Sequence, residues 1–217
     1  MNPINTLMKY KTIFWDFDGV IKDSVEVKSA AYTKLFWSKN LELNARIQRH
    51  HYENGGMSRF EKIPLYLSWL GLEYTPKVIS EYCELFSNYV FQSVIDSPWV
   101  PGAEKYLREN QFNQSFFLIS GTPKDELDRI IERIDLKGCF RQVFGAPTEK
   151  AQAIEEVLFS NGLKARDCIM VGDAMLDYKA AEKNSMSFLL RQHATNIEEF
   201  AHCNVPRIED FGYDEQT

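Results

Sequence analysis

The sequence of 217 residues contains 44% hydrophobic and 26% charged residues, a balance that supplies a packed core and excludes a globally disordered chain. Its formal charge is −6, with 25 basic against 31 acidic residues and no basic run, which argues against a nucleic-acid partner. We expect one large domain or one domain with an insertion, because two full domains would be cramped in this length.

The sequence also argues against membrane insertion and export. No apolar stretch reaches the roughly 20 residues that cross a bilayer, and Asp16 and Asp18 interrupt the apolar run nearest the N-terminus. The four cysteines form no C-x-x-C pair, which favours reduced, mostly buried thiols: Cys83, Cys139, Cys168 and Cys203. We therefore expect a cytoplasmic protein with no membrane partner, either a monomer or a homodimer.

Short, continuous apolar runs predict strands that are buried on both faces of a sheet, and helical patterns lie between them. This alternation predicts a parallel α/β sheet, whose ligand crevice lies beyond the carboxyl ends of the strands. In chain order, the expected elements are a strand at 12–15, a helix at 103–110, a strand at 116–119, a helix at 123–135, a strand at 143–144, a helix at 149–161, a strand at 169–171, a helix at 176–184 and a strand at 187–190.

A helical segment separates the first two strands. From Ser24 to about Ile95, apolar residues recur at helical spacing, as in Val27, Ala31 and Leu35. We expect about four helices that form a small domain, residues 24–96, inserted into an α/β core made of residues 1–23 and 97–217. The two connecting segments between these domains are candidates for a hinge.

Two carboxylates follow the first strand. Asp16 and Asp18 are two residues apart, so they can point the same way while Phe17 turns toward the core. Gly19 then permits a sharp turn. Two adjacent carboxylates repel one another unless a cation or a proton intervenes, which suits a site where Asp16 attacks phosphorus and Asp18 donates a proton. The alternative is that these acids only start a loop.

Ser120 and Gly121 follow the second strand. The serine hydroxyl and the backbone N–H groups of the turn favour an anionic group. Thr122 as N-cap and Pro123 as the first helical residue would also make an adequate structural helix start.

Lys150 opens the helix expected at 149–161. The helix dipole opposes a cation in the first turn, and a nearby anion would reverse that effect. An ordinary surface lysine is the alternative.

Asp173 lies just beyond the strand at 169–171, and Asp177 lies four residues further on, at the start of a helix. Carboxylates without neighbouring histidine or cysteine suit a hard cation, and an open octahedral shell shared with a phosphate suits Mg²⁺. Helix capping by Asp173 is the alternative.

The order of these motifs resembles the haloacid dehalogenase-like (HAD) superfamily of phosphoryl-transfer enzymes, and the resemblance covers nearly the whole chain. It implies a Rossmann-like α/β core with an inserted helical cap. The dehalogenases of the superfamily carry no acid at the position of Asp18, so the chain looks like a phosphatase or a phosphomutase. The helical insertion resembles the cap of the phosphoglycolate phosphatase and β-phosphoglucomutase group.

The resemblance also implies a role for each of the strand-tip residues. Asp16 would become an aspartyl phosphate, and Asp18 would act as general acid and later activate water. Ser120, Gly121 and Lys150 would hold the transferring phosphoryl group. Mg²⁺ would be the cofactor, bound by Asp16, Asp173 and the backbone carbonyl of Asp18, with Asp177 supporting the metal shell or Lys150.

Three basic residues of the insertion are candidate substrate contacts. Arg59 and Lys62 follow a Gly-Gly-Met-Ser segment that resembles the substrate loop of the same group, although a solvated helix start would look similar. Lys28 stands where the mutase has a histidine, which weakens the mutase interpretation. His50 and His51 flank the loop, and we do not assign them to the site.

Together these observations predict a Mg²⁺-dependent phosphatase that hydrolyses a small phosphorylated metabolite, such as a sugar phosphate or a phosphoglycolate-like acid. Two alternatives remain: a β-phosphoglucomutase-like phosphomutase, and a non-catalytic regulatory protein on the same scaffold.

Overall fold

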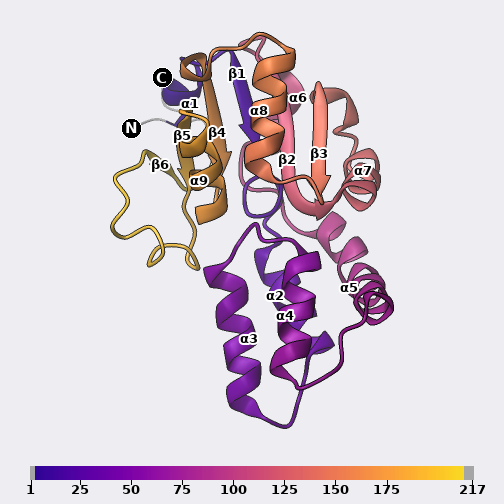
Figure 1. Cartoon of the computed structure of the whole chain (residues 1–217). Helices are drawn as coiled ribbons and strands as arrows, with labels where there is room; N and C mark the ends of the chain where they lie inside the picture. Colours follow the sequence, from indigo (N-terminus) through magenta and orange to yellow (C-terminus); the bar gives the residue numbers. More distant parts are fainter. Residues whose placement is uncertain (1–2, 213–217) are drawn as a thin grey trace.

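The computed structural model describes residues 3–212. A six-stranded parallel sheet with the order β3-β2-β1-β4-β5-β6 lies at its centre (Figure 1). The strands are β1 (Thr12–Trp15), β2 (Ser115–Pro123), β3 (Gln142–Ala146), β4 (Cys168–Gly172), β5 (Ser187–Arg191) and β6 (Arg207–Ile208). The predicted α/β class with a parallel sheet is confirmed.

Both faces of the sheet are buried, which explains why its strands are continuously apolar. Along β1, the side chains of Ile13 and Trp15 belong to one buried cluster, and that of Phe14 belongs to the other. Helices α6 (Ala103–Glu109) and α7 (Lys124–Arg133) contribute to the first cluster. Helices α8 (Lys150–Ser160) and α9 (Met175–Lys183) contribute to the second. The remaining short elements are α1 (Pro3–Leu7) and two 3₁₀ turns, η1 (Lys137–Cys139) and η2 (Ala165–Asp167).

Two details of the core differ from expectation. Strand β2 continues through a register shift to pair Pro123 with Ala146, so Thr122 lies in the strand and Pro123 is the N-cap of α7. The helix therefore begins at Lys124, and the expected capping by Thr122 is wrong. Strand β6 was not expected, because its two residues follow a polar segment and form no apolar run.

Residues 24–96 contain four helices, as the sequence predicted: α2 (Val25–Leu35), α3 (Leu41–Glu53), α4 (Arg59–Trp69) and α5 (Pro76–Asp96). The side chains of Asn40, Ser58 and Thr75 accept backbone N–H groups at the starts of α3, α4 and α5. Figure 1 shows this helical unit beyond the carboxyl ends of the strands, where the polar motifs converge.

The segments that enter and leave the helical unit lie side by side. The Asp23 N–H donates to the Pro98 carbonyl at 2.9 Å, and the Val100 N–H donates to the Ile21 carbonyl at 3.0 Å. Lys22 reinforces this contact, because its ammonium donates to the Ile95 carbonyl at 2.9 Å and lies 4.4 Å from the centre of the Trp99 ring.

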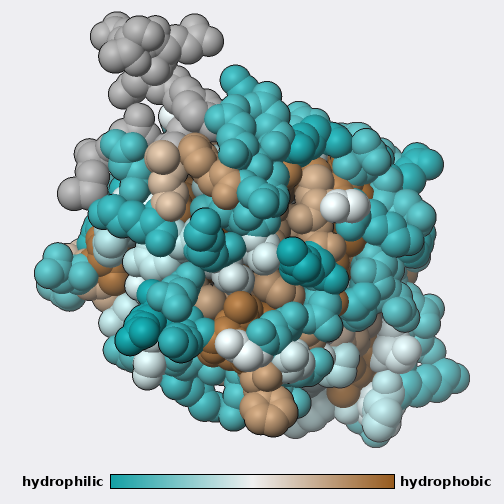
Figure 2. Space-filling model, turned by 90° about the horizontal axis from the view of Figure 1, so that it is seen from above, coloured by the Kyte–Doolittle hydropathy of each residue, from teal (hydrophilic) through white to brown (hydrophobic). Residues whose placement is uncertain are grey.

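The surface seen from the end of the sheet opposite the helical unit is mainly hydrophilic, with small hydrophobic areas between polar residues (Figure 2). Within residues 3–212, no helix has the length and the apolar character required to span a bilayer.

Candidate active site

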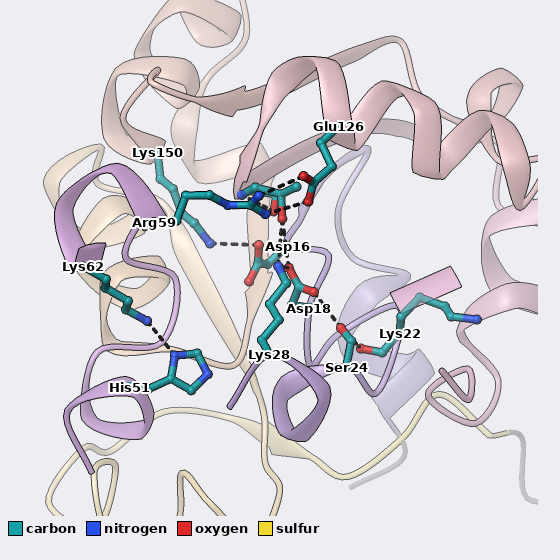
Figure 3. A network of polar contacts seen from close by, with 12 residues as sticks. Asp16, Asp18, Lys22, Ser24, Lys28, His51, Arg59, Lys62, Glu126 and Lys150 are labelled. Atoms are coloured by element: carbon teal, nitrogen blue, oxygen red, sulfur yellow. Dashed lines mark hydrogen bonds and ion pairs between the residues drawn. The ribbon is translucent and has the colours of Figure 1, made fainter. Parts of the chain in front are cut away.

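The end of β1 and the starts of α8 and α9 bring three charged side chains into contact. The Lys150 ammonium lies 2.8 Å from Asp16 Oδ1 (Figure 3). It also lies 2.5 Å from Asp177 Oδ1. All three side chains are buried, and Asp177 is fully so. Burial alone would lower the pKa of Lys150, but the two carboxylates raise it above its usual value. Lys150 is thus a permanent cation held at the nucleophile candidate, and the surface-lysine alternative is wrong.

The backbone of this region requires glycine at one point. Gly19 has φ +76°, and a Cβ at this position would lie 2.1 Å from Asp173 Oδ2. Asp173 therefore packs directly against the turn that follows Asp16 and Asp18. Phe17 is fully buried, as its position between the two acids predicted.

Asp177 is committed to the protein. Its Oδ1 pairs with Lys150, and its Oδ2 accepts the Ala174 N–H at 3.1 Å, at the start of α9. The N–H group at the start of α9 is therefore hydrogen-bonded by Asp177, and Asp173 does not cap the helix. Of the two roles considered for Asp177, the geometry favours the support of Lys150.

The residues fit a hard divalent cation. Carboxylate oxygens of Asp16, Asp173 and Asp177 lie within 4.8 Å of one another. Burial and the nearby Asp177 raise the pKa of Asp16 to about 7, and burial also raises the pKa of Asp173. A cation among these crowded carboxylates would offset their repulsion. The Asp18 carboxylate is not part of the cluster, so only its backbone carbonyl remains as the expected ligand.

Asp18 is surrounded by hydrogen-bond donors. The Ser24 hydroxyl donates to Asp18 Oδ1 at 2.6 Å, and Asp18 Oδ2 accepts from the Lys28 ammonium and from the Thr122 hydroxyl. Burial would raise the pKa of Asp18, but Lys28 and these hydroxyl groups hold it below its usual value. Asp18 is an anion in this arrangement, and Lys28 lies at the reacting end of the site.

Ser120 and Gly121 form the wall where the helical unit touches the core. Ser120 is buried, and its Oγ accepts the Thr122 N–H at 3.1 Å. A Cβ on Gly121 would lie 2.3 Å from the Gly56 carbonyl oxygen of the loop between α3 and α4. A cavity of about 70 Å³ remains between the two units, and it is lined by Asp16, Asp18, Lys28, Arg59, Lys62, Ser120, Gly121 and Asp173 among others.

Arg59 lines the cavity, but its guanidinium already has partners. It forms a two-pronged ion pair with Glu126 of α7, at 2.8 and 2.6 Å (Figure 3). It also donates to the Ser87 hydroxyl of α5. The side chains of Arg59 and Glu126 are only 3% and 7% exposed. This group joins two helices of the inserted unit to the core.

Lys62 also lines the cavity and is 2% exposed. Its ammonium lies 3.0 Å from Nδ1 of the buried His51, which belongs to α3. His51, which the sequence interpretation left out, is therefore part of the cavity wall.

Two further residues near the site were missed. Glu126 is one of two acids in the first turn of α7, where acids are common for helix stability alone. His193 Nε2 lies 2.9 Å from Asp173 Oδ2, and it follows the end of β5 by two residues. The rule that the carboxyl ends of parallel strands converge would have identified His193 if it had been applied to β5.

Comparison with known proteins gives a family and a fold. The family model described as haloacid dehalogenase-like hydrolase matches residues 10–184. No curated protein matches the chain.

Several solved structures share the architecture. A predicted phosphoglycolate phosphatase from Haemophilus somnus 129pt has a TM-score of 0.71 and 15% identity, with 94% of this chain and 95% of that chain covered. A β-phosphoglucomutase from Clostridium difficile has a TM-score of 0.73 and 18% identity, covering 93% and 92%. A mutant of CbbY from Rhodobacter sphaeroides, in complex with xylulose-(1,5)bisphosphate, has a TM-score of 0.72 and 14% identity, covering 93% and 95%.

Proposed function

Because the chain belongs to the haloacid dehalogenase-like hydrolase family, we propose that it is a Mg²⁺-dependent phosphomonoesterase acting through an aspartyl-phosphate intermediate. The observation that supports this most directly is the buried contact of Asp16 with Lys150, at 2.8 Å, at the end of the first strand. The Lys150 ammonium fixes the position of the Asp16 carboxylate. It also supplies positive charge that stabilises the phosphoryl oxygens during transfer.

In the first step, a carboxylate oxygen of Asp16 attacks phosphorus, and the ester oxygen of the substrate leaves. Lys150, the Ser120 hydroxyl and the Gly121 N–H bind the phosphoryl oxygens. The leaving oxygen takes a proton from Asp18, which receives it from the Lys28 ammonium to which it is hydrogen-bonded, so that Asp18 is again a carboxylate after the step. In the second step, Asp18 takes a proton from water, which attacks the acyl phosphate and releases phosphate and free Asp16.

Asp16, Asp173 and the backbone carbonyl of Asp18 would hold Mg²⁺, which supplies further neutralisation of the phosphoryl charge when bound. Asp177 keeps Lys150 in place through its 2.5 Å contact. His193 and the Asn196 amide, which donates to the Asp173 carbonyl at 2.8 Å, orient Asp173.

We further propose that residues 24–96 act as a cap that closes over the reacting atoms and excludes water from the first step. The close approach of Gly56 to Gly121 supports this role. A phosphomutase would use the same first step and then return the phosphoryl group to another hydroxyl. Measuring free phosphate against an isomeric product separates the two reactions.

The mechanism is tested with Asp16→Asn, assayed on an aryl phosphate with and without Mg²⁺. We expect turnover to fall on the order of 10³-fold or more, with the protein remaining folded. Asp167→Asn, an exposed acid on η2, is the matched control. Full activity in Asp16→Asn, or full wild-type activity after chelation of divalent metal, would contradict the proposal.

A further inference from the structure

The cations in and beside the cavity differ in whether a carboxylate balances them. Lys150 pairs with Asp16 and Asp177, Lys28 pairs with Asp18, and Arg59 pairs with Glu126. Within residues 3–212, Lys62 has no carboxylate oxygen at ion-pair distance, although it is as deeply buried as Arg59. The ammonium of Lys62 is therefore the unbalanced charge of this cavity.

The contact of Lys62 with His51 orients the ammonium without neutralising it. Burial and the neighbouring Lys62 lower the pKa of His51 well below its usual value, so its ring is neutral. Nδ1 then accepts one N–H of Lys62. An ammonium has three such donors, so His51 leaves the charge and further donors available to a ligand.

An unbalanced ammonium in a buried position is costly to the protein. Burial, with Lys28 nearby, lowers the pKa of Lys62 to about 7. A structural lysine would be expected to reach solvent or a carboxylate. The position of Lys62 on the cavity wall suggests instead that its partner comes with the substrate.

We propose that Lys62, positioned by His51, binds a second oxyanion of the substrate, so that the preferred substrates are small phosphomonoesters bearing a carboxylate or a second phosphate. This inference rests on the proposed phosphatase function. It gives Lys62 a different role from Arg59, whose guanidinium is already bound to Glu126 and Ser87. The aromatic ring of Tyr32, 5.7 Å from the Lys62 nitrogen, adds an apolar wall beside this oxyanion.

The test compares matched pairs of substrates on the full-length enzyme with Mg²⁺. One pair is phosphoglycolate and ethyl phosphate, which differ in the carboxylate. The other pair is 1,3-propanediol bisphosphate and propyl phosphate, which differ in the second phosphate. The measured quantity is the ratio of kcat/KM within a pair, because a general loss of activity cancels in this ratio.

We expect the wild-type enzyme to prefer the doubly anionic member of at least one pair by roughly 10- to 100-fold, the effect of one charge-assisted hydrogen bond. In Lys62→Met this preference should fall to near one, and in Lys62→Arg a preference should remain. Lys77→Met, which removes an 86% exposed lysine from α5, is the matched control and should keep the wild-type ratio.

The outcomes separate the two levels of inference. A wild-type ratio near one in both pairs, with brisk hydrolysis, overturns the second oxyanion site and leaves the phosphatase function standing. An unchanged preference in Lys62→Met overturns the role of Lys62. The absence of any phosphate release from all four compounds, and from an aryl phosphate, counts against the phosphatase function itself. The wild-type measurement decides the matter even if Lys62→Met does not fold.

Discussion

Lys150 stabilises the folded protein only as one member of a three-residue group. It lies between Asp16 and Asp177, and neither carboxylate has another cation at ion-pair distance within residues 3–212. Moving charged groups from water into the protein interior costs free energy. The ion pairs offset this cost only while all three partners are present. Removal of the central cation therefore leaves two buried carboxylates facing each other.

Lys150→Met should make stability strongly dependent on pH. The folded-state pKa values of Asp16 and Asp177 are already raised above the usual 3.8, and loss of the cation raises them further. A carboxyl whose pKa is higher when folded binds protons preferentially in the folded state, so its stability contribution is lost as pH rises. We expect a loss of roughly 3–5 kcal/mol at neutral pH that shrinks toward pH 4.

Urea unfolding of Lys150→Met and the wild type across this pH range, without added metal, measures the difference. Lys77→Met again provides the control for loss of a lysine. A difference that stays constant between pH 4 and pH 8 would mean that the two carboxylates are not coupled to Lys150.

At the scale of secondary structure, α7 is the core element that holds the inserted helices. Glu126 of α7 binds Arg59 of α4 and accepts the Ser87 hydroxyl of α5 at 2.6 Å. Nearby, the Arg129 guanidinium lies 4.3 Å from the centre of the Phe91 ring of α5. These contacts fix the orientation of the inserted unit relative to one face of the sheet.

A double-mutant cycle of Arg59→Met and Glu126→Gln tests this connection. Each single variant leaves a buried charge without its opposite charge, whereas the double variant removes both charges, so the losses should not add. We expect a coupling free energy of roughly 1–3 kcal/mol from urea unfolding. Strictly additive losses would show that the pair contributes nothing to the attachment of α4 to α7.

The elements that the sequence predicted were those with a strong local pattern. The five predicted strands and the four inserted helices are present. They were predictable because strands buried on both faces are continuously apolar, and helices buried along one stripe carry apolar residues at helical spacing. Asp16, Ser120 and Asp173 were identifiable for the same reason, because each directly follows or ends an apolar run. The partner of Arg59 was not identifiable, since Glu126 is 67 residues away and the pairing depends on how the helices pack.

At the scale of the whole molecule, the inserted unit meets the core through backbone in close contact. Gly121 shows no positive φ, so alanine suits its backbone, but the added Cβ would lie 2.3 Å from the Gly56 carbonyl oxygen. Because that obstacle is backbone, it cannot rotate away. The glycine is therefore needed for closure of the two units and not for the turn itself.

Gly121→Ala should hold the inserted unit away from the core. We expect kcat/KM to fall about 100-fold, the scale of a misplacement of roughly 1 Å, while the unfolding midpoint of the core changes little. Small-angle X-ray scattering should show a larger radius of gyration. Gly138→Ala, where a Cβ meets nothing within 4 Å, is the matched control. Equal kcat/KM values for the two variants would contradict this role.

The hydrogen bonds between the two connecting segments, Asp23 to Pro98 and Val100 to Ile21, have a consequence for how such a protein can diversify. The chain leaves the core and returns to it at neighbouring points. The strand order of the sheet therefore does not depend on the length of the inserted segment. Changes in these helices can alter which compounds are accepted, while Asp16, Asp18 and Lys150 keep their places in the core.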